Sequence, residues 1–171
     1  MPKTDVLVIG GSAAGLTAAI SARRFNPQAR IALVRKEKRV LIPCGIPYIF
    51  GTLESPADDL IPDAVLDKNN IELIVDEVTS INKGAKTVAT ASGQSIGYER
   101  MVLATGSYPL IPPLPGVNLE NVFIANKDIG YLTNMKQVLG QAKNLVIIGG
   151  GFIGLEFADE CRKIPGIRSV S

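Results

Sequence analysis

Short apolar runs and glycine-rich turns alternate at the start of the chain. Residues 6–9 (VLVI) are all apolar, which is typical of a strand buried on both faces. An alanine-rich stretch without Gly or Pro follows at residues 16–25 and predicts a helix that ends before Asn26-Pro27. Residues 30–34 predict a second buried strand. This order of strand, glycine turn, helix and strand predicts a βαβ unit with parallel strands.

The middle of the chain consists of shorter alternating segments. Residues 55–70 predict a helix that opens at Ser55-Pro56, and residues 71–75 predict a strand. Three short apolar segments follow, separated by glycine turns, and together they predict an antiparallel meander. These segments are residues 78–81, 87–90 and 95–96.

A proline-rich segment divides this region from the rest of the chain. Residues 100–104 predict one more buried strand, and residues 112–116 (PPLPG) predict a linker. Asp128 is predicted to cap a helix that ends near Gly140. The linker therefore suggests that a second structural unit begins close to residue 113.

The strand–turn–helix pattern returns at a constant offset of 139 positions. Residues 145–148 (LVII) form the apolar run, and residues 149–154 (GGGFIG) form its turn, with glycines at the same places as in residues 10–15 (GGSAAG). Such a turn lets the free N–H groups of a helix N-terminus point at a pyrophosphate. The sequence thus predicts two dinucleotide-binding loops. The simpler alternative, that the glycines serve only turning and packing, is stronger for the first loop, where Ser12 replaces the middle glycine.

Composition excludes several classes of protein. The chain has 171 residues, of which 46% are hydrophobic, and its net charge of +2 is spread along the sequence. This composition excludes disorder and gives no electrostatic signal for a nucleic-acid partner. No apolar run reaches the roughly 18 residues that a membrane span needs, and the N-terminus has no signal-peptide pattern. Two cysteines do not make a disulfide framework, so we expect a cytoplasmic protein.

The chain contains no histidine, which narrows its possible chemistry. A Ser-His-Asp or Cys-His nucleophile and a histidine-based zinc site are excluded, and no metal site is expected. Any proton transfer has to use another side chain, a cofactor, solvent or a part of the molecule outside this chain.

Taken together, these motifs resemble the pyridine nucleotide-disulfide oxidoreductase family. The resemblance rests on the two glycine loops, the meander, the strand end Ala104-Thr105-Gly106 and the proline-rich crossover. It implies an α/β fold: a Rossmann-like, three-layer ββα FAD-binding domain with a meander, followed by the start of a second Rossmann-like unit. Residues 1–112 would be the N-terminal part of the FAD domain, and residues 113–171 the beginning of an NAD(P)-binding domain. It also implies FAD and NADH or NADPH as cofactors, and a homodimeric full-length protein.

The segment Leu41–Tyr48 (LIPCGIPY) indicates a branch of this family. A single cysteine followed by Gly-x-Pro-Tyr is similar to the branch that contains coenzyme A disulfide reductases, persulfide and polysulfide reductases, NADH oxidases and NADH peroxidases. Cys44 is the candidate catalytic residue, because a thiolate beside a flavin can form a mixed disulfide, a persulfide or a sulfenic acid. A short helix beginning at Cys44 would favour the thiolate. Cys161 is expected to be an ordinary packing residue.

The resemblance also implies contacts for the other site residues. Thr17 and Arg24 match substrate-contacting positions of coenzyme A disulfide reductases, where an arginine could pair with a phosphate; an exposed helix charge explains them equally well. The carboxylate that usually binds the FAD ribose is missing after the second strand, and Glu37 is the nearest candidate. The predicted cofactor-binding residues are Gly10, Gly11, Ser12, Ala13, Ala14, Gly15, Arg35, Lys36, Glu37, Pro43, Val78, Ala104, Thr105, Gly106, Gly149, Gly150, Gly151, Phe152, Ile153 and Gly154.

Three functions remain open from the sequence. The first is an FAD-dependent NAD(P)H oxidoreductase that reduces a small-molecule disulfide, persulfide or polysulfide through Cys44. The second is an NADH oxidase or peroxidase that delivers electrons to oxygen or peroxide. The third is a non-catalytic nucleotide-binding fragment of such an enzyme, which would retain its cofactors weakly.

Overall fold

The computed structural model describes residues 3–171 and divides them into two compact units. The first unit contains the chain up to Val40 together with Ile61–Gly106, and the second contains Leu41–Leu60 together with Ser107–Ser171. The predicted domain division near residue 112 stays a prediction. By its contacts, however, the Cys44 segment groups with the C-terminal part of the chain. No helix of the described residues is long and apolar enough to cross a membrane.

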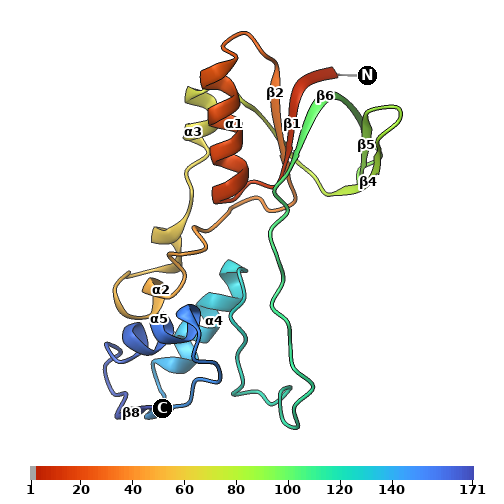
Figure 1. The fold of residues 1–171 in the computed structure, drawn as a ribbon. Helices are drawn as coiled ribbons and strands as arrows, with labels where there is room; N and C mark the ends of the chain where they lie inside the picture. Colours follow the sequence, from red (N-terminus) through yellow and green to blue (C-terminus); the bar gives the residue numbers. More distant parts are fainter. Residues whose placement is uncertain (1–2) are drawn as a thin grey trace. The chain divides into compact units, whose positions relative to one another are not determined.

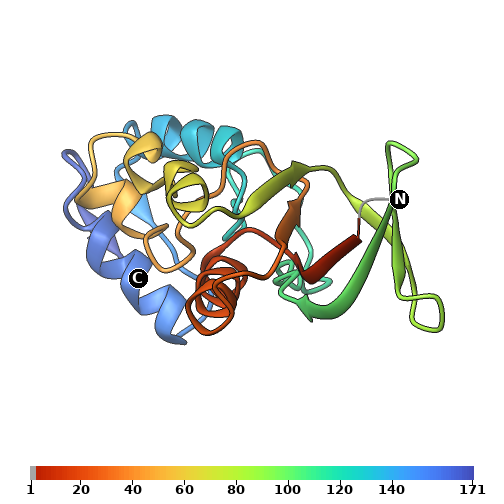
Figure 2. The ribbon, with the colours of Figure 1, turned by 90° about the horizontal axis from the view of Figure 1, so that it is seen from above.

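A six-stranded sheet with the order β3-β2-β1-β6-β5-β4 forms the centre of the first unit. The strands β3, β2, β1 and β6 are parallel to one another. On the other side of β6, the strands β5 and β4 are antiparallel and complete a meander with it. In Figure 2 the hairpin of β4 and β5, in yellow-green, extends from the rest of the sheet. The strands are β1 (Lys3–Ile9), β2 (Ile31–Arg35), β3 (Glu72–Val75), β4 (Val78–Asn82), β5 (Thr87–Thr90) and β6 (Ser95–Leu103).

Side chains of β1 alternate between two apolar clusters, which makes this unit three-layered. One face of the sheet is covered by α1 (Ala13–Phe25), as Figure 1 shows. Val8 belongs to the cluster on this face and packs with Ala19 and Leu33. Leu7 and Ile9 point to the other face and join the residues of the meander. Both faces of β1 are therefore buried, as its continuous apolar run predicts. The mixed α/β fold and the parallel βαβ unit are as expected.

Two elements differ from the sequence predictions. The predicted meander strand at 95–96 and the buried strand at 100–104 are one continuous strand, β6. It pairs with β5 over Ser95–Gly97 and with β1 over Gly97–Leu103. The predicted helix over residues 55–70 is wrong. It is split into a 3-10 helix η1 (Pro56–Asp59) and α3 (Ala64–Lys68), because Leu60 bridges to Leu41 and Pro62 has no N–H to continue a helix.

Three α-helices, the 3-10 helix η1 and one small sheet make up the second unit. The α-helices are α2 (Tyr48–Gly51), α4 (Ile129–Leu139) and α5 (Phe152–Cys161), and they surround one apolar cluster (Figure 1). Asp128 caps α4 as predicted, since its carboxylate accepts the Tyr131 N–H at 2.7 Å. The predicted strand at 145–148 is shorter than expected: β7 (Asn144–Leu145) pairs in parallel with β8 (Ser169–Val170).

Candidate functional site

The first glycine loop is tightly packed between β1 and the end of β6. Gly10 has a left-handed φ of +112°, and a Cβ atom there would lie 2.0 Å from the carbonyl oxygen of Ala104. A Cβ atom on Gly15 would lie 1.9 Å from the carbonyl oxygen of Gly10. Packing alone therefore requires these two glycines. The case for a nucleotide site rests on what the loop leaves accessible.

The N-terminus of α1 is open to an anionic ligand. Ser12 is its N-cap residue, Ala13 and Ala14 are exposed, and the first turn carries no acidic side chain. The orphan N–H groups and the positive end of the helix dipole favour negative charge at such a place. Thr105 and Gly106, which follow β6, are also exposed, and a Cβ atom on Gly106 would meet nothing within 4 Å. Loop and strand end thus have room for a diphosphate.

A buried arginine occupies the end of β2, where the family resemblance leads one to expect an acid. Only 1% of the Arg35 side chain is exposed, and its guanidinium donates to the carbonyls of Glu37 and Lys38, both at 2.9 Å. It also pairs with the Asp63 carboxylate at 2.8 Å. Its aliphatic stem fills the space next to Gly11, where a Cβ atom would lie 2.4 Å from the Arg35 Cδ. The arginine therefore holds the loop after β2 from inside.

The remaining predicted residues of the first unit differ in exposure. Lys36 and Glu37 are exposed on the loop that Arg35 holds, so the Glu37 carboxylate is accessible to a ribose. Val78, at the start of β4, is half-buried and packs against the apolar cluster of the meander. Sequence reasoning missed the Arg35–Asp63 pair, since nothing in a run of charged residues indicates which side chain is buried.

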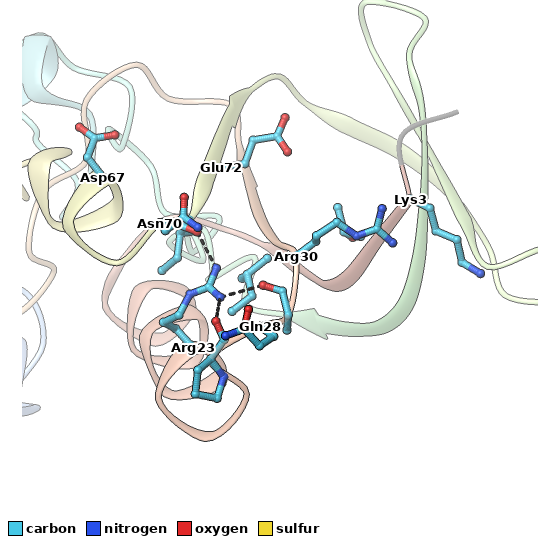
Figure 3. A pocket seen from close by; sticks show the side chains of 12 residues that line it. Lys3, Arg23, Gln28, Arg30, Asp67, Asn70 and Glu72 are labelled. Carbon is cyan, nitrogen blue, oxygen red and sulfur yellow. Dashed lines mark hydrogen bonds between the residues drawn. The ribbon is translucent and has the colours of Figure 1, made fainter.

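The candidate substrate residues Thr17 and Arg24 lie on α1, and the neighbouring Arg23 differs from them because its guanidinium is engaged by the backbone. Thr17 and Arg24 are exposed, whereas the Arg23 guanidinium donates to the carbonyls of Pro27 and Asn70 at 2.7 and 2.6 Å. Figure 3 shows these bonds beside an open cavity of about 550 Å³. The cavity is lined by the first residues of β1 and β3, so it lies at the opposite end of the parallel strands from the glycine loop. Arg23 is a structural residue.

In the second unit, Cys44 lies exposed in a tight turn. The Gly45 N–H donates to the Ile42 carbonyl at 2.8 Å, and the Ile42 N–H donates to the Asp59 carbonyl at 3.0 Å. Pro43 is half-buried beside it, and the Cys44 thiol is free. The expectation of a helix beginning at Cys44 is wrong, because α2 starts at Tyr48 and has only four residues. The turn is thus shaped by Pro43, Gly45 and the strand-like contact with residue 59.

A carboxyl group lies beneath this turn, and sequence reasoning missed it. Asp59 is only 3% exposed, and burial raises its pKa to about 6. A Cβ atom on Gly45 would lie 1.8 Å from its Oδ1, so the carboxyl packs directly against Gly45. No sequence signal marked it, since Asp58 and Asp59 look alike and only the fold buries one of them.

The second glycine loop repeats the backbone of the first but is open on its outer side. Gly149 has a φ of +127°, and a Cβ atom on Gly154 would lie 1.9 Å from the Gly149 carbonyl oxygen. Cβ atoms on Gly149, Gly150 and Gly151 would meet nothing within 4 Å. The first turn of α5 carries no acidic side chain, and its residues Phe152 and Ile153 are exposed. This helix N-terminus also has the features of a phosphate site.

The Cys44 segment packs on the helix that follows the second loop. The rings of Phe50 and Phe157 lie 5.3 Å apart, and the Thr52 hydroxyl donates to the Glu160 carboxylate at 2.7 Å. Cys161, next along α5, is buried, and burial raises the pKa of its thiol to about 11. Cys161 is therefore an unreactive packing residue, as expected, and the second unit brings Cys44 and the second loop into one compact body.

Known proteins with related sequences and structures resemble the chain along nearly its whole length. It is 35% identical to the NAD(P)H coenzyme A polysulfide/persulfide reductase of Pyrococcus horikoshii, covering 92% of this chain and 37% of that protein. It is 30% identical to an NADH oxidase of Enterococcus faecalis, covering 90% and 36%. The solved structure of an NAD-dependent persulfide reductase from A. fulgidus superposes with a TM-score of 0.82 at 32% identity, covering 97% of this chain and 33% of that one.

These matches identify the family of the chain and show how much of its relatives' length it covers. It spans about a third of the length of the curated relatives it matches. Residues 4–170 match the family described as pyridine nucleotide-disulphide oxidoreductase. The Rossmann-like fold, the two glycine loops and this match agree, so the chain is a member of the pyridine nucleotide-disulphide oxidoreductase family.

Proposed function

We propose that this chain is the FAD- and NAD(P)H-binding portion of an oxidoreductase that reduces a sulfur–sulfur bond through Cys44. The observation that carries the proposal is the exposed Cys44 thiol in its tight turn, in a family member with two open helix N-termini. Two relatives, a polysulfide/persulfide reductase and a persulfide reductase, are named for reactions of sulfur–sulfur bonds, which supports sulfur as the acceptor.

The residues present fit the two cofactors that the family implies. Within the first unit, FAD would be held by residues 10–15, Thr105-Gly106 and the exposed Glu37. NADH or NADPH would be held by residues 149–154. The absence of carboxylates from both first turns and the open space beside Gly149–Gly151 are the features that fit a diphosphate.

Cys44 would act as the sulfur nucleophile. Its thiolate attacks one sulfur of a disulfide, persulfide or polysulfide, so that a Cys44–sulfur bond forms and the other sulfur leaves as a thiolate or sulfide. Two electrons from NAD(P)H are then needed to cleave the mixed disulfide and restore the thiolate. A bound flavin supplies the means of passing this electron pair from NAD(P)H. Access of the substrate to Cys44 is consistent with its exposure.

An exposed arginine on α1 favours a substrate that carries a phosphate. Thr17 and Arg24 are exposed on α1, so the Arg24 guanidinium is accessible to a phosphate. A phosphorylated thiol such as coenzyme A would use this charge. Arg23 offers a matched comparison, because its guanidinium is occupied by backbone carbonyls.

The test uses the chain, or a longer protein that contains it, loaded with FAD. Turnover of polysulfide with NADH is expected to disappear in Cys44→Ser and to persist in Cys161→Ser, whose thiol is buried. Retention of full turnover in Cys44→Ser would exclude the role of Cys44. Arg24→Gln is expected to raise the KM for a coenzyme A disulfide without changing turnover of inorganic polysulfide.

A second candidate is an oxidase, supported by the similarity to an NADH oxidase. In that case Cys44 would cycle through a sulfenic acid, and oxygen uptake would match NADH consumption without release of thiol. Simultaneous measurement of oxygen and free thiol separates the two reactions. An absorbance spectrum without bound flavin would instead favour the non-catalytic nucleotide-binding fragment.

A further inference from the structure

Asp59 places a buried polar atom close to the Cys44 turn. The Oδ2 atom of Asp59 has no hydrogen-bond partner among residues 3–171, although the residue is only 3% exposed. Buried carboxylates are normally paired or hydrogen-bonded, because burying an isolated charge is costly. An unpartnered carboxyl oxygen at such a place therefore points to a function of the adjacent turn.

The position of this carboxyl is fixed from two sides. The Asp59 carbonyl accepts the Ile42 N–H at 3.0 Å, which ties it to the residue two positions before Cys44. On the other side, Ser55 and Asp58 form a reciprocal capping box that holds η1, with the Ser55 N–H donating to the Asp58 carboxylate at 2.8 Å. The carboxyl is thus built into the turn.

The carboxyl lies beside the backbone of the residue that follows Cys44. Its Oδ1 packs against the Gly45 Cα, as the 1.8 Å distance to a hypothetical Cβ atom requires. Adjacent Cα atoms are about 3.8 Å apart, so the carboxyl lies within roughly 7 Å of the Cys44 Cα. At this range in a partly desolvated turn, two negative charges disfavour each other measurably.

The other charged groups around η1 are already engaged or exposed. The helices packed against η1 are α2 and α4. Lys136 of α4 donates its ammonium to the carbonyls of Ile49 and Leu53, each at 2.7 Å. Tyr48 of α2 and Glu54 are exposed, and Asp58 is held by the capping box.

We propose that Asp59 is a positioning residue whose protonation state controls how readily the Cys44 thiol ionises. The two side chains together carry one negative charge more readily than two. This inference rests on the proposed function of Cys44 as the reactive sulfur. Protonated Asp59 favours the thiolate, and ionised Asp59 opposes it. In a chain without histidine, this carboxyl gives Cys44 a titrating neighbour near neutral pH, since burial raises its pKa to about 6.

The test compares the alkylation rate of Cys44 by iodoacetamide in wild type and in Asp59→Asn between pH 5 and 8, with the modified peptide identified by mass spectrometry. The ratio of the variant rate to the wild-type rate is expected to be close to one at pH 5 and to rise about three- to tenfold by pH 7.5. A purely structural role would change this ratio equally at every pH. Glu54→Gln, an exposed carboxylate of the same segment, is the matched control and is expected to stay at one. A ratio that does not change with pH would overturn the proposal.

A second measurement uses the wild-type chain, so the proposal can be tested even if Asp59→Asn does not fold. Carboxymethylation of Cys44 by iodoacetate adds a negative charge, whereas carbamidomethylation by iodoacetamide adds none. The Asp59 carboxyl, followed by carbon-13 NMR, is expected to titrate at higher pH in the carboxymethylated protein. Identical titrations in both proteins would overturn the coupling. Neither measurement needs a cofactor or turnover, so failure of the coupling and failure of the proposed function are distinguished.

Discussion

The two glycine loops share one backbone design but differ in their surroundings. Gly10 and Gly149 have φ values of +112° and +127°, and in both loops the last glycine lies against the carbonyl of the first. Around the first loop, β1 is paired with strands on both sides and Ile9 is 6% exposed. Around the second, the corresponding Ile148 is 83% exposed. The loop geometry is thus a local property, whereas its support comes from tertiary packing.

This difference has a consequence for ligand binding. The first loop is braced by Ala104 and by the Arg35 stem, so its N–H groups are held in place before a ligand arrives. The second has no described atom within 4 Å of a Cβ atom on Gly149, Gly150 or Gly151. We therefore expect the first loop to tolerate substitution less well than the second.

The two methionines of the described residues let each unit be followed separately. Met101 lies in the first unit and Met135 in the second. Oxidation by hydrogen peroxide along a urea gradient, read by mass spectrometry, gives an unfolding midpoint at each methionine.

The largest effect is expected for Gly10→Ala against Gly149→Ala. At Gly10 the new methyl would overlap the Ala104 carbonyl and also strain a left-handed backbone, which together cost about 3 kcal/mol or more at Met101. At Gly149 only the backbone strain applies, which costs about 1–2 kcal/mol at Met135. Equal losses at the two positions would contradict the difference in support.

Ile9→Thr against Ile148→Thr tests the apolar segments that lead into the two loops. The first change removes apolar contact and buries a hydroxyl, so we expect a loss of about 2 kcal/mol at Met101. The second replaces an exposed side chain, so the Met135 midpoint should move by less than about 0.5 kcal/mol. A comparable loss at Ile148 would mean that this side chain is covered in solution.

The sequence predicted those parts of the fold that depend on local pattern. The parallel βαβ unit, the meander and the Asp128 cap were read correctly, because each depends on neighbouring residues. The 55–70 helix was wrong because Leu60 pairs with Leu41, a contact between distant residues that outweighs helix propensity.

The candidate site was predictable to a similar extent. The turns at the two glycine loops follow from motifs, whereas the role of Cys44 stays a prediction. The partners of the buried charges do not follow from any motif. Asp59 and Arg35 are buried by tertiary contacts, with Gly45 and with Asp63 respectively. A charged residue in a polar stretch looks solvated in the sequence, so neither was expected to be buried.

The two units should respond to pH in opposite directions. In the first, hydrogen bonding from Lys3 lowers the pKa of Glu99 to about 2, and the pKa values of Asp5 and Asp76 are also lowered, mainly by the Arg30 N–H and the Ser92 hydroxyl. The stability that these three carboxylates contribute is fully present above their unfolded pKa values and is lost as the pH falls. The Met101 midpoint should therefore rise between about pH 2 and 5.

In the second unit the sign is reversed. The pKa of Asp59 rises from 3.8 to about 6 on folding, so the folded chain holds its proton longer and stability falls as the pH rises through this window. The Met135 midpoint should fall between about pH 4 and 6, by at most about 1.4 kcal/mol per pH unit. Asp59→Asn should remove this fall. A Met135 midpoint that is flat in wild type would contradict the raised pKa.

The smallest effect is expected for the ion pairs, and it bears on the support of the first loop. Asp63→Asn keeps an acceptor for the buried Arg35 guanidinium but removes its charge partner; because Asp63 is itself half exposed, we expect a loss of about 1 kcal/mol at Met101. Asp159→Asn removes a partner of Lys163 that is 75% exposed, so the Met135 midpoint should stay within about 0.5 kcal/mol. Equal effects would mean that Arg35 gains little from Asp63. The bonds from its guanidinium to Glu37 and Lys38 would then be sufficient to hold the loop after β2.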